Sequence, residues 1–509
     1  MKLHFLLQAL SLHASVAYAQ ERIQDECIRT KVAILGAGVA GITAAQALAN
    51  QSIDDFVIVE YQDRMGGRLL EVNFGQKLDG SSYIVEAGAS WVQGLGSFGR
   101  PENPIYTLVK KYNLEALISD DSNVTTYDRQ GKSNYRDMLK KFKDAKERVA
   151  IQAGSALRNN FQDQTARAAL RLVGWNPPPD DAHAQVAEWF SFDGEYMFTP
   201  EESSDVFTSV VDNATFKYLS DESRFIHDQR GFSTIVKNEA GTFLKPNDPR
   251  LHLRTIVSGI NYTDHGVTIS TRNGTCIDAE YTIMTFSLGV LQRDIIEFYP
   301  EFPSWKKIAI ANFEFGTYTK IFLQFNQSFW DKTQYILWAD PHQRGYYPQF
   351  QPLDLPEGLP DSRILIATVV NKQAYKVEAQ SNEETQAEIM AVLRRMYGVN
   401  IPDPTAIYYA RWTQEPWAYG SFSNWPPSTS LQTHQNLRAN VGRLFFAGEA
   451  TSQEFFGYLQ GAYFEGLAVG GMVARASVLS TSKSQLEELT PESGEDEGHE
   501  FLISVDRED

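Results

Sequence analysis

Apolar residues gather near the start of the chain into a short run that leads directly into glycines. Residues 31–35 read K-V-A-I-L, residues 36–41 read G-A-G-V-A-G, and an alanine-rich segment follows. A short continuous apolar run is typical of a buried strand, whereas alanine favours a helix. The pattern predicts a strand, a glycine turn and a helix, which is how a dinucleotide-binding fold begins.

Each glycine of this turn has a predicted task. Gly36 allows the tight turn, Gly38 lets backbone N–H groups approach a pyrophosphate at the positive end of the helix, and Gly41 lets helix and strand pack closely. A second apolar run, F-V-I-V-E at residues 56–60, ends in an acid about twenty residues later, where a ribose-binding carboxylate belongs. We therefore predict that Glu60 binds a ribose; the alternative is a solvated strand end.

Further along the chain, helical spacing alternates with strand-like spacing. Residues 104–176 are expected to be helical, and so are residues 180–192, with D-G-E at 193–195 ending that helix. Residues 252–285 alternate apolar and polar residues between turn signals, which predicts a meander of three strands. The remaining apolar segments predict strands at 317–323, near 335, 364 and 407 and at 443–449, and helices at 305–311, 383–397 and 461–478.

The composition indicates a folded protein with an acidic surface. The chain has 509 residues, of which 42% are hydrophobic and 12% aromatic, as expected of two or three folded domains. Its net charge of -18 argues against a nucleic-acid partner and favours cationic ligands or plain solubility. Part of that charge lies in residues 479–509, which are rich in Ser, Glu and Gly and are expected to form a disordered acidic tail.

Residues 1–19 have the pattern of a secretory signal peptide. Lys2 gives a positive start, residues 3–16 are mostly apolar, and A-Y-A at 17–19 fits cleavage between small residues. The alternative is an ordinary amphipathic N-terminal helix. No other apolar run is long enough to span a membrane, so we expect a secreted protein without a membrane anchor. Secretion agrees with N-glycosylation sequons at Asn50, Asn123, Asn213, Asn261, Asn273 and Asn326.

Cys27 and Cys276 are the only cysteines of the chain. An oxidising compartment permits a disulfide between them, and both the paired and the free state remain open. Two cysteines do not make a zinc site unaided, and the chain has no H-E-x-x-H motif or comparable ligand cluster. No metal is therefore expected.

Two further motifs lie toward opposite ends of the chain. M-G-G-R at residues 65–68 can bring the Arg68 guanidinium over a pyrophosphate, a bidentate task that suits Arg better than Lys. R-L-F-F-A-G-E at residues 443–449 reads as a buried strand that ends in glycine and an acid. Together with the glycine turn, this arrangement resembles the FAD-dependent amine oxidase family over nearly the whole mature chain, and within it the secreted plant-type polyamine oxidases.

The resemblance implies a mixed α/β fold, in which a Rossmann-like FAD-binding domain is joined to a second, substrate-binding domain of mixed sheet and helices. The FAD-binding domain would comprise residues 20–100, 225–302 and 415–478, and the substrate-binding domain residues 101–224 and 303–414. The FAD would be held non-covalently, because Ser421 stands where monoamine oxidases carry the cysteine that tethers it. Cofactor contacts would come from Gly36, Gly38, Gly41, Glu60, Arg68, Ala89, Glu449, Leu459 and, through its backbone at the adenine, Val257.

Lys320 lies in Y-T-K-I-F-L, residues 318–323, among apolar neighbours. A lysine is costly to bury, so it either points to solvent from one face of a strand or lies at a functional site with a shifted pKa. The same motif in the amine oxidases implies a catalytic Lys320 that contacts the reactive nitrogen of the flavin through a water.

Two aromatic residues are implied to enclose the substrate. In S-F-S-N-W-P at residues 421–426 and F-G-Y-L-Q-G-A-Y at residues 456–463, Phe422 and Tyr458 would stand before the flavin on either side of the amine's alkyl chain. Taken alone, either ring suits core packing. Apolar walls exclude water and favour the neutral amine, the form that gives up a hydride.

Glu195 and Gln93 bear on which amine would bind. Polycations need carboxylates along a tunnel, and Glu195 matches an acid that the plant-type enzymes place there. Gln93 departs from the pattern, because those enzymes have glutamate at its position. The change keeps a hydrogen-bonding side chain but removes a charge, which would favour acetylated or less charged amines.

The reaction that the resemblance implies is oxidation of a carbon beside a secondary amine of spermine, spermidine or an N-acetyl derivative by hydride transfer to FAD. Water would hydrolyse the imine to an aldehyde and an amine, and O2 would reoxidise the flavin and become H2O2. We expect a monomer. The alternatives are an FAD-dependent oxidase of another amine, either a monoamine or an amino acid, and a flavin-binding protein without turnover.

Overall fold

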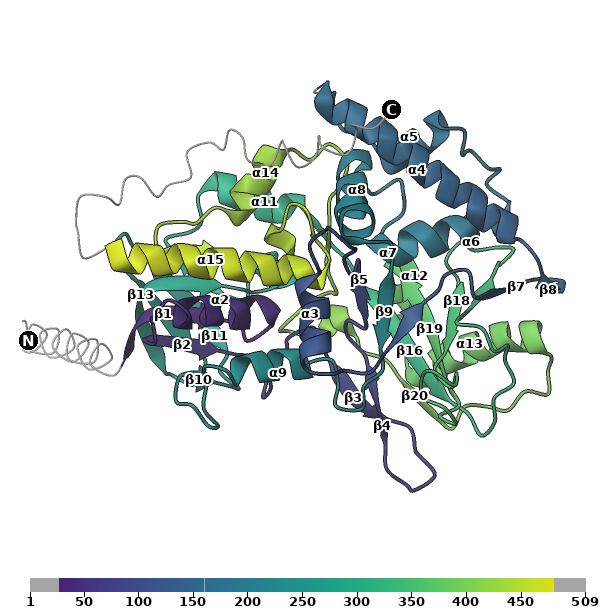
Figure 1. Cartoon of the computed structure of the whole chain (residues 1–509), viewed down its shortest axis with the longest axis horizontal. Helices are drawn as coiled ribbons and strands as arrows, with labels where there is room; N and C mark the ends of the chain where they lie inside the picture. Colours follow the sequence, from purple (N-terminus) through teal and green to yellow (C-terminus); the bar gives the residue numbers. More distant parts are fainter. Residues whose placement is uncertain (1–26, 160, 480–509) are drawn as a thin grey trace, which may run out of the picture.

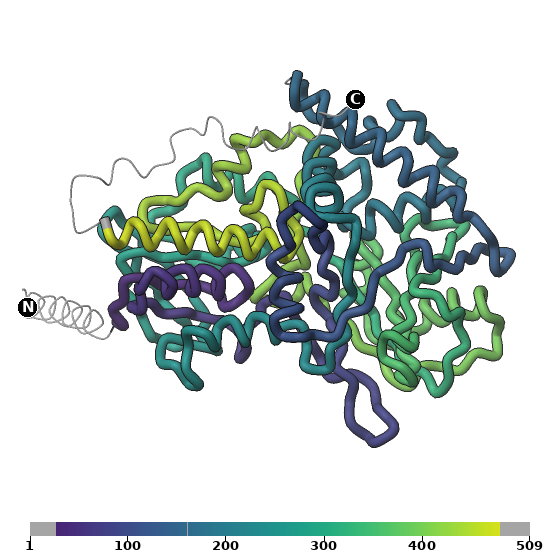
Figure 2. The backbone as a smooth tube through the Cα atoms, viewed as in Figure 1, coloured from purple at the N-terminus to yellow at the C-terminus, as the bar shows by residue number. Residues whose placement is uncertain are grey.

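Two large β-sheets organise the residues that the computed structural model describes, 27–159 and 161–479. Figure 1 and Figure 2 show them in two parts of an elongated molecule, one carrying α2 (Val39–Ala49) and α15 (Leu459–Leu479), the other α13 (Asn382–Tyr397). The expected signal peptide and the expected tail beyond residue 479 lie outside the described residues.

The first sheet has eight strands and is built around β1 (Ile28–Leu35). β1 lies between β2 (Phe56–Val59) and β13 (Cys276–Met284), and all three run parallel. The strand, turn and helix predicted at the glycines are confirmed, as is the meander, since β11 (Val257–Tyr262), β12 (Val267–Thr271) and β13 pair antiparallel. The sheet is completed by β10 (Leu251–His252), β14 (Glu297–Tyr299) and β22 (Leu444–Phe446).

Small residues let α2 and α15 pack closely over this sheet, where Figure 1 shows them side by side. A Cβ on Gly466 would lie 2.3 Å from the carbonyl oxygen of Ala40, and a Cβ on Gly470 would lie 2.6 Å from that of Ala44. Real side chains do not approach backbone so closely. The glycines of the last helix therefore fix how it meets the helix that follows the glycine turn.

The second sheet has seven strands, in the order β20-β16-β19-β18-β17-β7-β8. Its pairs are antiparallel except β7 with β17, which run parallel. Residues of α13 share a hydrophobic core with it, and a capping box of Ser381 and Glu384 begins that helix. The strands are β20 (Ala406–Tyr408), β16 (Tyr318–Gln324), β19 (Ile364–Val370), β18 (Gln349–Pro352), β17 (Tyr335–Trp338), β7 (Val124–Asp128) and β8 (Gly131–Ser133).

The helical prediction for residues 104–176 is wrong in the middle. Helices α3 (Pro104–Lys111), α4 (Arg136–Arg158) and α5 (Ala166–Leu172) form, but β6 (Ala116–Ser119), β7 and β8 lie between the first two. β7 reads V-T-T-Y-D, and β-branched and aromatic residues fit a pleated, half-buried surface better than a helix. Strand propensity and pairing with β17 and β8 outweigh the apparent helical spacing.

The predicted helix end at residues 193–195 is also wrong. α6 (Ala182–Glu188) continues through a π-helical turn, η1 (Trp189–Asp193), into α7 (Gly194–Tyr196), and the helix ends at Met197 in a left-handed conformation with φ 64°. Aspartate weakens a helix by competing for backbone hydrogen bonds. Here the Asp193 carboxylate is bound by Arg344 instead, so the helix continues.

Cys27 and Cys276 form a disulfide, which settles the pairing that the sequence leaves open. The bridge ties the start of β1 to the start of β13, where Ile28 already pairs with Ile277. The remaining elements are β3 (Glu71–Phe74), β4 (Tyr83–Glu86), β5 (Trp91–Gln93), β9 (Ser223–Ile226), β15 (Glu314–Phe315), β21 (Ser423–Asn424), α8 (Asp205–Asp212), η2 (Asn213–Leu219), α9 (Thr234–Ala240), α10 (Leu288–Leu291), α11 (Ser304–Asn312), η3 (Trp412–Gln414), α14 (Leu431–Arg438) and η4 (Glu449–Thr451).

Candidate active site

A cavity of about 700 Å³ is lined by residues of both large sheets. It runs from the glycine turn after β1, past Lys320 on β16, to the helix that carries Glu195. Every residue predicted to bind cofactor or substrate lines it except Gly41, and Ala89, Val257 and Leu459 are among them. A Cβ on Gly41 would lie 1.9 Å from the carbonyl oxygen of Gly36, so Gly41 sits behind the wall, where helix meets turn.

The glycine turn presents bare backbone to one end of the cavity. Gly36 has φ 117°, a conformation that favours glycine, and its N–H donates to the carbonyl of Val59 on the neighbouring strand at 2.7 Å. Gly38 precedes the first turn of α2, and no side chain caps that helix start. The N–H groups of the first turn are therefore available to an anionic ligand.

Glu60 follows β2 at the same end of the cavity. Its carboxylate accepts hydrogen bonds from the backbone N–H groups of Ala37 and Gln62, both at 2.8 Å. Burial nevertheless raises the pKa of Glu60, and these donors oppose the rise. The two backbone contacts orient the carboxylate at the edge of the glycine turn, where the sequence places a ribose-binding acid.

Arg68 and Glu449 form an ion pair across the cavity wall, with 2.9 Å between Nη1 and Oε1. Arg68 also donates to the carbonyl of Ser421 at 2.8 Å. The other oxygen of Glu449 accepts from the Ser423 hydroxyl at 2.6 Å and from the Gly457 N–H at 2.8 Å. Glu449 thus holds the guanidinium between the segments at residues 65–68 and 421–457, which are far apart in sequence.

Lys320 is buried, with 3% of its surface exposed. Its ammonium donates to the carbonyl of Gly88 and to the hydroxyl of Ser90. Burial lowers the pKa of Lys320, and the nearby carboxylate of Glu86 opposes this. The interpretation of Lys320 as a solvent-facing strand residue is therefore excluded, and the amine lies in the cavity with a pKa shifted toward neutrality.

An acid and aromatic rings line the far end of the cavity. Tyr458 donates its hydroxyl to the Glu195 carboxylate, and Phe422 lies 6.2 Å from Tyr318 between ring centroids. Burial raises the pKa of Glu195 to about 7, and the hydrogen bond from Tyr458 opposes the rise. Gln93 ends β5 and also faces the cavity. The cavity joins a backbone-lined end to an end lined by aromatic rings, where the Glu195 carboxylate lies beside a tyrosine and Lys146, Asp212 and other charged side chains also line the wall.

Comparison with known proteins identifies the family. The model of the flavin containing amine oxidoreductases matches residues 39–470. Polyamine oxidase 1 of Zea mays is 34% identical over 481 residues, covering 91% of this chain and 94% of that protein. Polyamine oxidase 7 of Oryza sativa subsp. japonica is 34% identical over 456 residues, covering 86% and 94%. The chain belongs to the flavin-containing amine oxidoreductase family.

Solved structures of lower identity share the fold. A putrescine oxidase bound to putrescine superposes with a TM-score of 0.69 at 18% identity and covers 89% of this chain and 100% of its own. Cyclohexylamine oxidase from Brevibacterium oxydans gives a TM-score of 0.67 at 19% identity, with coverage of 88% and 99%. The mixed α/β fold expected from the sequence is confirmed.

FAD is the cofactor of this amine oxidase, and the backbone-lined end of the cavity fits it. A dinucleotide needs uncapped N–H groups for its pyrophosphate and an acid for its ribose, which the start of α2 and Glu60 provide. At Gly88 the wall of the cavity packs directly against the backbone of residues 68–70. A Cβ there would lie 1.9 Å from the carbonyl oxygen of Arg68.

Two π-helical turns flank the substrate end of the amine oxidase cavity. η1 and α7 contribute Phe190, Ser191 and Glu195 to the wall, and η2 contributes Phe216. A π turn is wider than an α turn and occurs most often at functional sites. Because of this wider turn, one continuous helix presents Glu188 to the core and, seven residues later, Glu195 to the cavity.

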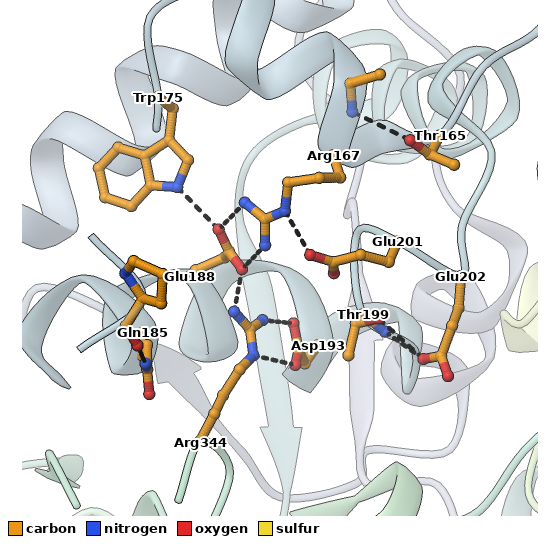
Figure 3. A network of polar contacts seen from close by, with 12 residues as sticks. Thr165, Arg167, Trp175, Gln185, Glu188, Asp193, Thr199, Glu201, Glu202 and Arg344 are labelled. Carbon is orange, nitrogen blue, oxygen red and sulfur yellow. Dashed lines mark hydrogen bonds and ion pairs between the residues drawn. The ribbon is translucent and has the colours of Figure 1, made fainter. Parts of the chain in front are cut away.

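A buried ionic network holds the first of these turns (Figure 3). Glu188 accepts from Arg167 and from the Trp175 indole at 2.8 Å, and Arg344 bridges Glu188 and Asp193. Burial raises the pKa of Asp193 to about 6, against the pull of Arg344. Because the two carboxylates bracket η1, the network fixes the turn that precedes Glu195.

Several lining residues were missed by sequence reasoning. Tyr318 lies two residues before Lys320 on β16, so strand alternation could have placed both on one face. Asp121 and Asp221 gave no such signal. Ser223 on β9 pairs with Gln93 on β5 and with Ser119 on β6, and Asp221 and Asp121 each lie two residues from this set. Only the pairing of these three strands brings the two aspartates to the cavity.

Neither a metal nor a membrane span is evident in the part of the chain that the structure describes. No group of three or more His, Cys, Asp or Glu side chains there is arranged to hold a metal ion. Among the same residues, 27–159 and 161–479, no helix is both long and apolar enough to cross a membrane.

Proposed function

We propose that this amine oxidase acts on polyamines. The observation that carries the proposal is the cavity itself, which leads from Lys320 between aromatic rings to the Glu195 carboxylate. A polyamine would present a secondary amine to the flavin and carries a distal ammonium, which we assign to the Glu195 carboxylate. Plant polyamine oxidases at 34% identity support the same substrate class.

FAD, held by the start of α2, Glu60 and Arg68, would supply the acceptor for a hydride from the carbon beside the amine nitrogen, and its electrons would reduce O2 to H2O2. The chain supplies the surroundings. Phe422, Tyr318 and Tyr458 exclude water and favour the neutral amine, because the charged form loses its hydration there. Lys320 lines the cavity and would exchange protons with the bound amine, since burial lowers its pKa.

Three rival functions are less consistent with the cavity. An amino-acid oxidase needs an arginine that faces the substrate carboxylate, and the arginines among the described lining residues are Arg68 and Arg272. Arg68 is paired with Glu449, and Arg272 follows β12 beside Val257 at the cofactor end. A monoamine carries no second ammonium for the Glu195 carboxylate, whose hydrogen bond in the described residues comes from Tyr458. A flavin-binding role without turnover leaves the burial of Lys320 unexplained, and bleaching of the flavin by an amine without O2 would exclude that role.

Product analysis tests the proposal directly. The purified protein is incubated with spermine, spermidine and N-acetylspermine, and the amines and aldehydes are separated and identified. Diaminopropane with an aminoaldehyde places oxidation on one side of the secondary nitrogen, whereas spermidine or putrescine places it on the other. Oxidation of benzylamine or an amino acid in preference to all three polyamines would contradict the proposal.

The flavin is expected to be released when the protein is denatured with acid. Ser421 has a hydroxyl where a tethering cysteine would be needed, and both cysteines of the chain are consumed by the disulfide. After precipitation, absorbance near the flavin maximum should appear in the supernatant. Flavin that stays with the pellet would show a covalent bond to another side chain.

Affinity for spermine should rise as the pH is raised through about 7, the pKa to which burial raises Glu195. Below this pH the carboxyl is protonated and neutral; above it the carboxylate attracts the ammonium of the substrate, which stays charged. KM for spermine is measured across this range for the wild type and for Glu195→Gln. The variant should lose the rise, and an equal rise in both proteins would assign it to another group.

Gln93→Glu should improve binding of spermine by about tenfold or less, because a partly buried charge pair is offset by desolvation. The benefit should be smaller for N-acetylspermine bound with its uncharged end at this position. Apparent affinities for the two substrates, measured at two salt concentrations, check this. Equal gains for both, or a gain abolished by moderate salt, would mean that Gln93 lies at an exposed rim.

We also propose that the protein is secreted as a monomer. The disulfide between Cys27 and Cys276 supports secretion, because such bonds persist in oxidising compartments. Four of the sequon asparagines are exposed, as glycan acceptors must be: Asn50, Asn261, Asn273 and Asn326. Mass analysis of protein from the culture medium, before and after glycosidase, tests both the leader cleavage and the glycans.

A further inference from the structure

Glu86 is a buried carboxylate close enough to Lys320 for the two charges to interact. It ends β4, has 5% of its surface exposed and accepts the Phe232 N–H at 2.6 Å through Oε1. Its Oε2 atom has no hydrogen-bond partner among the described residues. A buried carboxylate oxygen is rarely left alone, and a proton or a buried water commonly satisfies it. Nothing in the binding of amine or FAD described above uses this group.

Glu71 lies beside Glu86. The strands β3 and β4 pair antiparallel with Glu71 directly across from Glu86, so both side chains project from the same face, about 5 Å apart at Cβ. Glu71 accepts from the Ser233 hydroxyl at 2.8 Å and from the Lys237 ammonium at 2.7 Å, both through Oε1. Its Oε2 atom is again without a partner in the described part of the chain.

Four neighbouring side chains form a row from the cavity to the surface, and their exposure to solvent increases along it. Lys320 and Glu86 are buried, the side chain of Glu71 is 15% exposed, and that of Lys237 on α9 is 40% exposed. Arg64 faces both carboxylates, with its guanidinium held by the carbonyls of Leu69 and Gly67. The row thus connects the cavity to the surface through groups that bind and release protons.

We propose that Glu86 and Glu71 carry protons between Lys320 and the solvent. The inference rests on the role proposed for Lys320. A polyamine enters as an ammonium and must lose one proton before its carbon can give up a hydride. The aromatic side chains exclude water from the space around the amine, so the proton needs a route through the protein.

Each transfer breaks one N–H or O–H bond and forms another, and no electrons move. The substrate ammonium gives its proton to neutral Lys320. The Lys320 ammonium then protonates the Glu86 carboxylate, Glu86 protonates Glu71, and Glu71 releases the proton to solvent beside Lys237. Buried water fills the gaps at the unpartnered oxygens. The same route, run inward, returns a proton when O2 is reduced to H2O2.

The charges around Lys320, Glu86 and Glu71 favour proton transfer between them. Burial raises the pKa of Glu86 and lowers that of Lys320, so the two approach each other, while Lys320 and Lys237 oppose the rise at Glu86 and Glu71 adds to it. A proton shared between groups of similar pKa moves at little cost.

Glu86→Gln tests the route, because the amide oxygen still accepts the Phe232 N–H but the side chain no longer carries a proton. The resting holoenzyme is titrated through pH 7 in the infrared, without amine, to observe the C=O band of a protonated carboxylic acid. Glu239→Gln is the matched control, a buried carboxylate on α9 that is paired with Lys111 and does not line the cavity.

The proposal expects Glu86→Gln to lose a band that Glu239→Gln keeps. It also expects the anaerobic reduction of the flavin by any amine substrate to slow by about tenfold to a hundredfold, less than a directly acting acid or base contributes. Should Glu86→Gln fail to fold, Glu71→Gln interrupts the same row nearer the surface and should slow the same step. An unchanged band and an unchanged rate would overturn the proposal. The infrared result requires no amine, so it is independent of which substrate the enzyme takes.

Discussion

Lys320→Met is expected to slow reduction of the flavin by amine by roughly a hundredfold to ten-thousandfold, the range that a positioned proton-transfer group contributes. The methionine side chain has nearly the length of lysine and remains compatible with burial, but it neither holds a water by hydrogen bonding nor exchanges a proton. Rapid mixing without O2, followed by flavin absorbance, measures the step. Flavin content should stay close to that of the wild type, because Lys320 contacts Gly88 and Ser90 and does not anchor the dinucleotide end.

Lys306→Met provides the control for removing a buried lysine. Lys306 is fully buried on α11 and donates to the carbonyls of Leu437 and Ala439 at the end of α14, outside the cavity. Its replacement should lower stability without changing the rate at which bound flavin is reduced. A rate equally affected by both substitutions, or by neither, would remove Lys320 from the catalytic machinery.

Local sequence was sufficient where a single turn determines the structure. The glycines at 36, 38 and 41 each meet a geometric need within a few residues, so strand, turn and helix could be predicted together with the backbone-lined end of the cavity. Lys320 required more. Its amine is covered by residues 88–91, which lie more than two hundred positions away in the chain, and only the resemblance of its motif distinguished a buried amine from an exposed one.

Residues that meet only through tertiary structure were beyond prediction. Glu86 and Glu71 belong to neighbouring strands, but which residues face each other depends on the register of β3 and β4. β7 reads as a helix by spacing because the strand that pairs with it, β17, lies two hundred residues away in the chain. The disulfide remained open for the same reason, since its two halves are 249 residues apart.

The network around η1 is the clearest case. Arg344 lies in the loop between β17 and β18, and Arg167 lies on α5. Between them they bind Glu188 and Asp193, the carboxylates at the two ends of η1 (Figure 3). No pattern along the chain relates these positions. Aspartate and glycine at 193 and 194 instead indicate the end of a helix, and the arginine that reverses this outcome is about 150 residues away.

Replacing Arg344 with methionine should therefore destabilise the protein by about 3–5 kcal/mol, the usual cost of leaving a buried charge without its partner. Chemical denaturation at saturating FAD measures the change. Arg394→Met is the matched control, because the ion pair of Arg394 with Asp403 is largely exposed and is worth about 0–1 kcal/mol. Equal losses for the two variants would mean that the Arg344 network is not buried in solution.

The loss at Arg344 should also depend on pH, and the sign follows from Asp193. Burial raises its pKa to about 6 while Arg344 opposes the rise, so removal of the arginine raises the pKa further. The folded variant then binds a proton that the unfolded chain releases, so its stability falls as the pH rises above the ordinary aspartate range and levels off above the new pKa. Compared with the wild type, Arg344→Met should be least destabilised in mild acid.

KM for spermine should rise more than kcat falls in the same variant, because the turn before Glu195 loses its support while Lys320 keeps its own contacts. A destabilisation that is independent of pH, with KM unchanged, would show that Asp193 is satisfied by other groups and that the network does not position Glu195.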